Sequence, residues 1–389
     1  IYNHLDIREL LIKEANFSDW KGHSDTETLL VAICHWGLEE TLKKLNGMFA
    51  FALWDDVSKN LYLTRDRLGE KPMYYGSSSD TFLFGSQLKS FSVHPSWKGK
   101  IDLEALSLYM KYGYIPSPHC IYRDIKKLPP AHYIVVSNSG NSISEPKCYW
   151  NIEGSSEQSQ SYDFYNPELT IESLENLLTD SIKRRMEADV PLGAFLSGGI
   201  DSTAVVALMQ HISKEPVKTF SIGFKEEDYD EARQAKNIAN YLGTEHSELY
   251  VSPEDTLSLL PKLTDIYDEP FADNSQIPTF IVSNLAKKHV TVSLSGDGGD
   301  ELFYGYSRYF QAYSWWSKLS LVPRFFRQLI SLILTTIPGA LARLLEIFTQ
   351  KHKLKQFHLS KTTKRLEGRI LDSYCPFIIF IDTYYVHTT

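Results

Sequence analysis

The string SGGIDS at residues 197–202 combines residue types that could hold phosphate groups. It follows a short apolar run, and an apolar helix is expected from about Thr203. Gly198 and Gly199 lack a Cβ, so the backbone could approach a ligand closely there, while Ser197 and Ser202 add hydroxyl donors. The N–H groups and positive dipole end of the helix would favour an anion. Asp201 would repel phosphate unless a divalent cation lay between them, so the string predicts a metal–nucleotide site.

The alternative for this string is an ordinary strand-to-helix turn, in which the glycines serve only the backbone geometry. The site is not a Walker A loop, because no Gly-Lys-Ser/Thr follows at the required spacing.

A second polar string, SLSGDGGDELFYGYSRY at 293–309, also follows an apolar run. Ser295 and Gly296 could offer backbone contacts to a nucleotide, and Asp297, Asp300 and Glu301 gather negative charge. An acidic, glycine-rich surface loop would look similar, but two such loops, both after parallel-strand candidates and each carrying an Asp, favour a shared metal–nucleotide site. A third string, YDEPFADNSQIPT at 267–279, fits either a helix end broken by proline or a loop that contacts the acceptor substrate.

The elements around these strings alternate between strands and helices. Such alternation predicts an α/β fold with a parallel sheet, helices on both faces, and ligands at the carboxyl ends of the strands. Strands are expected at 194–196, 217–224, 247–251 and 290–294, with helices at 171–186, from 203, at 230–242 and within 253–267.

The first 151 residues have a different pattern. Helices are expected at 26–36 and 101–112, and four strand-like runs lie between them, which predicts a β-rich layered α+β domain. The polar stretch 158–166 is typical of a linker. We therefore divide the chain into residues 1–151, a linker at 152–170, and residues 171–389.

Composition limits the classes of function. The chain has 389 residues, 43% hydrophobic and 23% charged, as in soluble globular proteins, and a net charge of −8 that argues against a nucleic-acid partner. Four separated cysteines form no disulfide framework, which predicts a cytoplasmic protein. The apolar stretch 329–345 is interrupted by Pro338 and Arg343, so we expect a buried helix or hairpin rather than an integral membrane segment.

Taken in order, these strings resemble the glutamine-hydrolysing asparagine synthetases. The resemblance rests on SGGIDS, FSIGF and SGDGGDELF, and on SDTETLL, NGMFAFALWD, RDRLGEKPMYYG and IPSPHCIYRDIKKLPPAHY nearer the start. It implies an N-terminal-nucleophile glutaminase domain joined to an adenine-nucleotide α-hydrolase (PP-loop) domain. Ammonia from glutamine would attack a β-aspartyl-AMP formed from aspartate and ATP, giving asparagine, AMP and pyrophosphate. The resemblance allows a homodimer.

The resemblance also implies roles for individual residues. Asp25 would hold the amino group of glutamine, Asp201 and Asp300 would bind Mg²⁺, and Asp297 would be catalytic, at a position where many members have Glu. The remaining ATP-binding residues would be Leu196, Ser197, Gly198, Gly199, Ser202, Ile222, Ser295 and Gly296.

Some positions depart from the family pattern. Ile1 is not the family's nucleophilic cysteine, Tyr304 replaces a usual Gly, and the C-terminal Lys-rich and Arg-Ala-Ser-Met segments are not found, so we expect a chain truncated at both ends. Cys34, Cys120 and Cys148 are expected to be buried and inert. The transfer reaction needs cations near the phosphates, and Arg308 is the nearest cation after the second loop, so we expect nucleotide binding with little turnover.

The alternatives are an enzyme of the same plan acting on another carboxylate, as β-lactam synthetases do, and a non-catalytic nucleotide-binding remnant.

Overall fold

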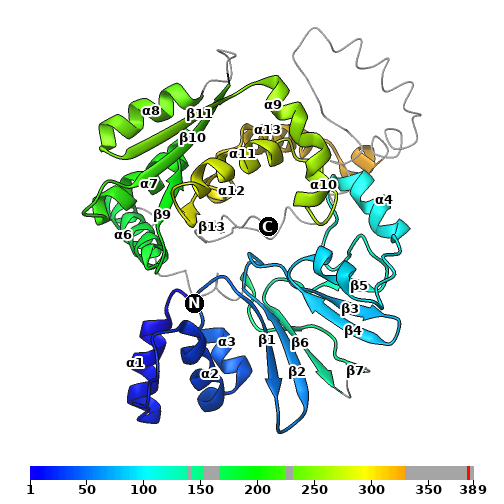
Figure 1. Ribbon diagram of the computed structural model, residues 1–389. Coiled ribbons are helices and arrows are strands. Elements are labelled where there is room, and N and C mark those ends of the chain that lie inside the picture. The colour runs from blue at the N-terminus through cyan, green and yellow to red at the C-terminus, as the bar shows by residue number, and fades with distance from the viewer. Residues whose placement is uncertain (138–139, 141, 153–165, 225–230, 329–382, 386–389) are drawn as a thin grey trace. The chain divides into compact units, whose positions relative to one another are not determined.

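The computed structural model describes residues 1–137, 140, 142–152, 166–224, 231–328 and 383–385 (Figure 1). The chain forms two compact units, residues 1–297 with 379–389, and residues 298–378. The boundary expected at 152–170 falls inside the first unit, and the division into domains stays a prediction.

Three helices at the start of the chain cover one face of an antiparallel sheet. They are α1 (His4–Ala15), α2 (Asp25–Trp36) and α3 (Leu38–Lys44). The Ser24 hydroxyl accepts a hydrogen bond from the backbone N–H of Thr26 and so caps α2, as its position before the apolar repeat predicts. The apolar side chains that join these helices to the sheet include Ile7, Leu11, Ala32, Leu42, Phe49 and Tyr133.

Two antiparallel sheets pack against each other behind these helices. Leu63 and Ile134 from the first sheet meet Met73 and Tyr75 from the second in one buried cluster, which therefore forms the middle of the domain. The first sheet has the order β1 (Ala50–Asp55), β2 (Asn60–Arg65), β6 (His132–Ser137) and β7 (Ser142–Ile143), and β8 (Lys147–Cys148) also pairs with β6. The second sheet has the order β4 (Thr81–Gly85), β3 (Tyr74–Ser78) and β5 (Ile125–Lys127).

The outer face of the second sheet is covered by η1 (Leu88–Val93) and α4 (Leu103–Tyr112). Asp102 caps α4 by accepting hydrogen bonds from the N–H groups of Glu104 and Ala105, and Gly113 ends the helix with φ 80°. The layers are thus helix, sheet, sheet and helix, which confirms the expected β-rich layered α+β arrangement.

The second half of the first unit contains the expected parallel sheet. Its order is β11 (Glu245–Val251), β10 (Lys218–Phe224), β9 (Leu192–Phe195), β12 (Val292–Leu294) and β13 (Thr383–Tyr385). The first four strands run parallel, and β13 is antiparallel to β12.

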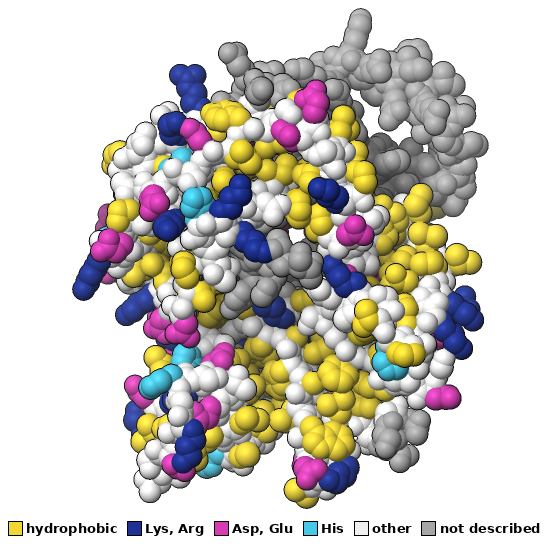
Figure 2. Space-filling view, in the orientation of Figure 1, with side chains coloured by type: hydrophobic (Ala, Val, Ile, Leu, Met, Phe, Trp, Pro, Cys, Tyr) yellow, Lys and Arg dark blue, Asp and Glu magenta, His cyan; other side chains and the backbone are white. Residues whose placement is uncertain are grey.

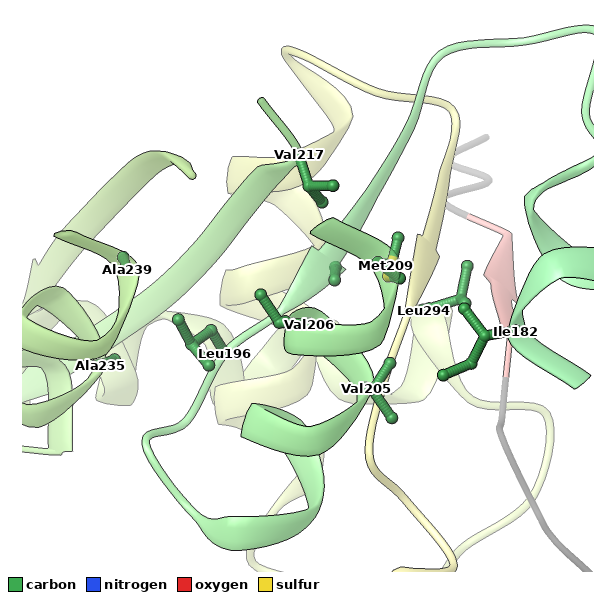
Figure 3. Packing of buried hydrophobic residues seen from close by; sticks show 10 residues of the cluster. Ile182, Leu196, Val205, Val206, Met209, Val217, Ala235, Ala239 and Leu294 are labelled. Atoms are coloured by element: carbon green, nitrogen blue, oxygen red, sulfur yellow. The ribbon is translucent and has the colours of Figure 1, made fainter. Parts of the chain in front are cut away.

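Helices cover both faces of this sheet. On one face, α6 (Pro167–Met186), α7 (Ile200–Ile212) and α8 (Glu231–Leu242) contribute side chains to one buried cluster with the strands (Figure 3). On the other face, α11 (Gln276–Lys287) packs Ala286 against Phe220. The alternation of Ala194 and Leu196 with Phe195 along one strand follows from the twofold period of β-structure.

Several expected boundaries were wrong by a few residues. Helix α6 begins at Pro167 instead of residue 171, because Asn166 caps it and proline suits its first turn. Helix α7 begins at Ile200 instead of Thr203, so Asp201 and Ser202 lie in its first turn. The helix expected within 253–267 is divided into α9 (Pro253–Leu259), η5 (Leu260–Lys262) and α10 (Leu263–Ile266), since Pro261 has no N–H to donate.

The second unit contains α12 (Gly299–Phe303) and α13 (Ser307–Leu319) among its described residues. The apolar stretch 329–345 and Cys375 lie outside the described residues. Among the helices that the structure describes, none has the length and apolar character needed to cross a membrane.

Charged side chains of both signs are interspersed on the face drawn in Figure 2. Hydrophobic side chains gather over the antiparallel strands β1 and β2 on the same face. Among the residues of β1, Trp54 is 54% exposed. This face is therefore not dominated by one sign of charge.

His246 on β11 joins two neighbouring strands through side-chain hydrogen bonds. Its Nδ1 lies 2.9 Å from Oγ1 of Thr219 and its Nε2 lies 3.1 Å from Oγ of Ser221, both on β10. Burial lowers the pKa of His246 from its ordinary value, because the charged imidazolium loses hydration. The unfolded chain therefore takes up this proton more readily than the folded chain.

We expect His246 to make the protein less stable as the pH falls below about 6.5. The free energy of unfolding, measured by urea titration, should decrease from pH 7.5 to pH 5.5 more steeply for the wild type than for His246→Gln. His211→Gln, at an exposed position in the last turn of α7, is the control and should keep the wild-type slope. Equal slopes for the wild type and His246→Gln would contradict this assignment.

Candidate functional site

Three parallel strands end at one edge of the sheet and bring the two glycine-containing loops together. Residues Ser293 and Leu294 of β12 pair with Gly193 and Ala194 of β9, and Phe220 of β10 pairs with Phe195. The residues that follow each strand therefore lie at the carboxyl edge, where ligands bind in open α/β sheets. The loop after β9 and the loop after β12 are neighbours there.

The loop after β9 is held in place by its own serines. Ser202 is buried and its Oγ lies 2.9 Å from Oγ of Ser197, while the backbone N–H of Ser197 also donates to it. Gly198 has φ 83°, and a Cβ there would meet the backbone N of Ala235 at 3.1 Å, so a glycine is needed. Gly199 is the N-cap of α7, and the first N–H groups of this helix point into the loop.

The loop after β12 touches the start of α7. A Cβ at Gly296 would lie 2.5 Å from the backbone N of Ser202 and 2.8 Å from the carbonyl carbon of Asp201. Ser295 is buried, and its hydroxyl donates to Oδ2 of the exposed Asp297 at 3.2 Å. The backbone of this loop therefore packs directly on the first turn of the helix that carries Asp201.

The predicted ATP-binding residues of the first unit meet at this edge. The side chain of Leu196 does not reach this edge, because it is fully buried among Val205, Val206 and other core residues. Any contact of Leu196 with a ligand would therefore come from its backbone. Figure 3 shows Leu196 inside this cluster. Ile222 is half-buried near the end of β10. The binding roles of these residues stay predictions.

Asp201 is half-buried in the first turn of α7. A carboxylate at this position offers the oxygen ligand that Mg²⁺ prefers. Asp300, the second predicted ligand, is in α12 and belongs to the second unit. The structure leaves the pairing of these two carboxylates a prediction.

Aromatic side chains surround the acidic turn of the second unit. The Tyr306 hydroxyl donates to Oε1 of Glu301 at 2.6 Å, and this hydrogen bond raises the pKa of Tyr306 to about 12. The Arg308 guanidinium lies 4.0 Å from the centre of the Tyr306 ring. Tyr304 has φ 62°, a left-handed conformation that glycine adopts without strain.

The predicted glutamine-binding residue, Asp25, is half-buried and is the first residue of α2. Its Oδ2 lies 2.6 Å from the N-terminal nitrogen of Ile1. Burial raises the pKa of the Asp25 carboxyl, but the hydrogen bond and charge of the ammonium outweigh burial, so the pKa lies below its ordinary value.

The prediction of buried, inert cysteines was correct for Cys120 and wrong for two others. Cys34 and Cys148 are exposed. Helix α2 buries Thr28 and Ala32, which leaves Cys34 off its inner face, and β8 is a short strand with both residues exposed. Burial raises the pKa of the Cys120 thiol to about 12, which keeps it protonated and unreactive.

Two groups of residues near the site were missed by the sequence analysis. Gln234 of α8 donates through Nε2 to the carbonyl O of Gly198 at 2.9 Å and so fixes the loop from the side. Asp268 and Glu269, in the third string, contact residues from the first 130 positions. The sequence around Gln234, and around Asp268 and Glu269, has no motif or characteristic spacing that could have indicated these contacts.

Comparison with known proteins identifies the family. Residues 173–372 match the family described as asparagine synthase, and residues 1–150 match the glutamine amidotransferase domain. The chain belongs to the asparagine synthase family. The resemblance inferred from the motifs is confirmed, and with it the α/β fold class.

Relatives of the chain are found among bacterial, archaeal and fungal proteins. Asparagine synthetase [glutamine-hydrolyzing] 1 of Bacillus subtilis is 38% identical over 79% of the chain and 47% of its own length. Putative asparagine synthetase [glutamine-hydrolyzing] 2 of Methanocaldococcus jannaschii is 38% identical over 80% of the chain and 59% of its own length. Amidase chyE of Penicillium rubens is 26% identical over 79% of the chain and 46% of its own length. The chain therefore spans about half the length of the relatives that it matches.

Proposed function

We propose that the protein makes asparagine from aspartate, with ATP as the activating substrate and glutamine as the nitrogen donor. The observation that carries the proposal is the edge of the parallel sheet where 197–202 and 295–297 adjoin, with Gly198 and Gly296 in close backbone contact with their neighbours. The membership of the asparagine synthase family supports the choice of reaction.

The residues at this edge have distinct roles in the proposed reaction. The N–H groups at the start of α7, with the Ser197 hydroxyl, would hold the phosphates of ATP. The backbone after β12 would position the nucleotide, and Asp297 would act beside it as the catalytic carboxylate. Aspartate would attack the α-phosphorus through its side-chain carboxylate, forming β-aspartyl-AMP and releasing pyrophosphate; ammonia would then displace AMP.

Mg²⁺ fits the chemistry of this edge, because a carboxylate beside a phosphate loop needs a cation between the two negative groups. We propose that Asp201 and Asp300 hold it. Bound Mg²⁺ would neutralise charge that develops on the phosphate oxygens.

The glutaminase half is proposed to bind glutamine through Asp25. The support is that residues 1–150 match the glutamine amidotransferase domain, in which Asp25 is half-buried at the start of α2 and offers a carboxylate to the α-ammonium group of glutamine. Ammonia released there would supply the second half.

We also propose that residues 1–389, assayed alone, turn over slowly. Transfer to the α-phosphorus needs fixed cations where negative charge develops, and the loss of such a donor typically costs about 10²–10³ in rate. Arg308, the cation nearest the second loop in sequence, lies on the Tyr306 ring and is exposed, which supports a structural role for it.

The proposed metal role of Asp201 gives a direct test. Asp201→Asn should weaken Mg-ATP binding by about tenfold or more, which corresponds to ~1.4 kcal/mol, because the amide loses the charge that binds the cation. Isothermal calorimetry on the wild type and the variant measures this difference. Asp189→Asn, at an exposed position before the other end of β9, is the matched control and should bind as the wild type does. Equal affinity of Asp201→Asn and the wild type would remove Asp201 from the site.

A product assay separates the candidate reactions. The chain is incubated with Mg-ATP, ammonium and one carboxylate at a time, and pyrophosphate is measured against a sample without carboxylate. Release that depends on aspartate supports the proposal, and release with another carboxylate favours the alternative acceptor. Mg-ATP binding without any release would favour a nucleotide-binding remnant, and the absence of binding would overturn the proposal.

A further inference from the structure

Two acidic residues of the third string (residues 267–279), Asp268 and Glu269, contact the glutaminase half and are largely shielded from solvent. Oε1 of Glu269 accepts a hydrogen bond from the backbone N–H of Ile121 at 2.8 Å. Its Oε2 lies 2.5 Å from Nζ of Lys127, at the end of β5, and 3.5 Å from the Tyr74 hydroxyl on β3. One carboxylate thus receives donors from two strands and from a loop of the glutaminase half.

The neighbouring residues of the string repeat this pattern. Oδ2 of Asp268 accepts from the backbone N–H of Leu88 at 2.6 Å, where η1 begins. Lys89 donates to the carbonyl O of Asp265 at 2.9 Å, so the contact also reaches α10. The backbone N–H of Ala272 donates to the carbonyl O of Gly113 at 2.6 Å.

These charges are largely removed from water. The exposed fraction of the side chain is 15% for Lys127, 11% for Glu269 and 13% for Asp268. Lys127 also donates to the carbonyl O of Ile115 at 2.7 Å. A buried ion pair adds little net stability, but loss of one partner leaves the other charge buried and uncompensated. Such pairs are therefore sensitive to the arrangement of the two surfaces that they join.

We propose that Asp268 and Glu269 are a docking device that fixes the segment 267–279 on the glutaminase half. Leu88, Ile121 and Lys127 are its receiving groups; α10 ends just before the segment, and α11 begins within it. Both carboxylates are engaged in docking, so the segment contacts any acceptor substrate through its other residues. The docking contacts do not depend on the proposed reaction. Only the description of the receiving half as a glutaminase rests on the proposed function.

Amide hydrogen exchange followed by mass spectrometry, on the complete chain 1–389, tests the docking across the two halves. Glu269→Gln should accelerate exchange at 113–127 by about tenfold, the size expected for loss of one charged hydrogen bond. Lys127→Met should accelerate exchange at 263–276 by a similar factor. The double variant should show no more than the larger single effect, since both substitutions remove one contact.

Two further variants keep the test decisive. Lys126→Met, at the exposed neighbour of Lys127, is the matched control and should leave exchange at 263–276 unchanged. Lys89→Met removes a partly exposed partner of the segment and should accelerate exchange at 263–272 even if the Glu269 variant does not fold. Acceleration confined to the half that carries the substitution, or additive effects in the double variant, would overturn the proposal. Neither ATP binding nor product formation enters this readout, so failure of the proposed function would leave the result interpretable.

Discussion

Replacement of Gly296 by alanine is expected to weaken Mg-ATP binding by about 100-fold. The added Cβ would lie 2.5 Å from the backbone N of Ser202 and 2.8 Å from the carbonyl carbon of Asp201, and neither atom can move without the first turn of α7. The two loops would therefore separate. A displacement of about 1 Å at a site of this kind can cost on the order of 10²-fold in function.

The same substitution should cost about 1–3 kcal/mol of folding free energy, the usual cost of an oversized group in a packed region. Calorimetric titration measures binding, and urea unfolding measures stability, so a fall in affinity can be compared with the fraction of folded protein. Gly22→Ala is the matched control, because the nearest atom to its Cβ would be Oε2 of Glu27 at 3.7 Å. Wild-type affinity in the folded Gly296→Ala variant would show that the close packing of the two loops is not needed for binding.

Local patterns in the sequence were sufficient to predict most elements around the site. The strands β9 and β12 are short apolar runs with a serine one or two residues after their ends, and the helices between the strands carry apolar residues at helical spacing. Because parallel strands end at one edge, SGGIDS and SGDGGDELF could be expected near each other without knowledge of any contact. The register of Leu294 with Ala194 confirms that their strands are neighbours.

Contacts between distant segments could not be predicted in this way. The approach of Gly296 to Ser202 depends on how tightly β12 packs beside β9, and a glycine in a loop can equally well serve a tight turn. Asp268 and Glu269 read as an acidic turn, and only the fold shows that Ile121 and Lys127 receive Glu269. The exposure of Cys34 likewise depends on which face of α2 packs against α1 and α3.

Asp66 gives the largest expected effect on stability within residues 1–150, which match the glutamine amidotransferase domain. Its side chain is fully buried after β2. Oδ1 accepts hydrogen bonds from the backbone N–H groups of Leu68 and Glu70, and Oδ2 accepts from those of Phe49 and Lys71. One carboxylate therefore satisfies four donors, three of them in the loop 67–71.

Asp66→Ala should reduce the free energy of unfolding by about 3–5 kcal/mol, because several buried N–H groups lose their acceptor at once. Urea titration measures the loss. Asp66→Asn retains one acceptor oxygen and should lie between the alanine variant and the wild type. Asp55→Ala is the matched control: Asp55 also accepts from backbone N–H groups, those of Val57 and Ser58, but in an exposed turn where water can replace it. Equal losses for Asp55→Ala and Asp66→Ala would show that burial of the donors is not what makes Asp66 important.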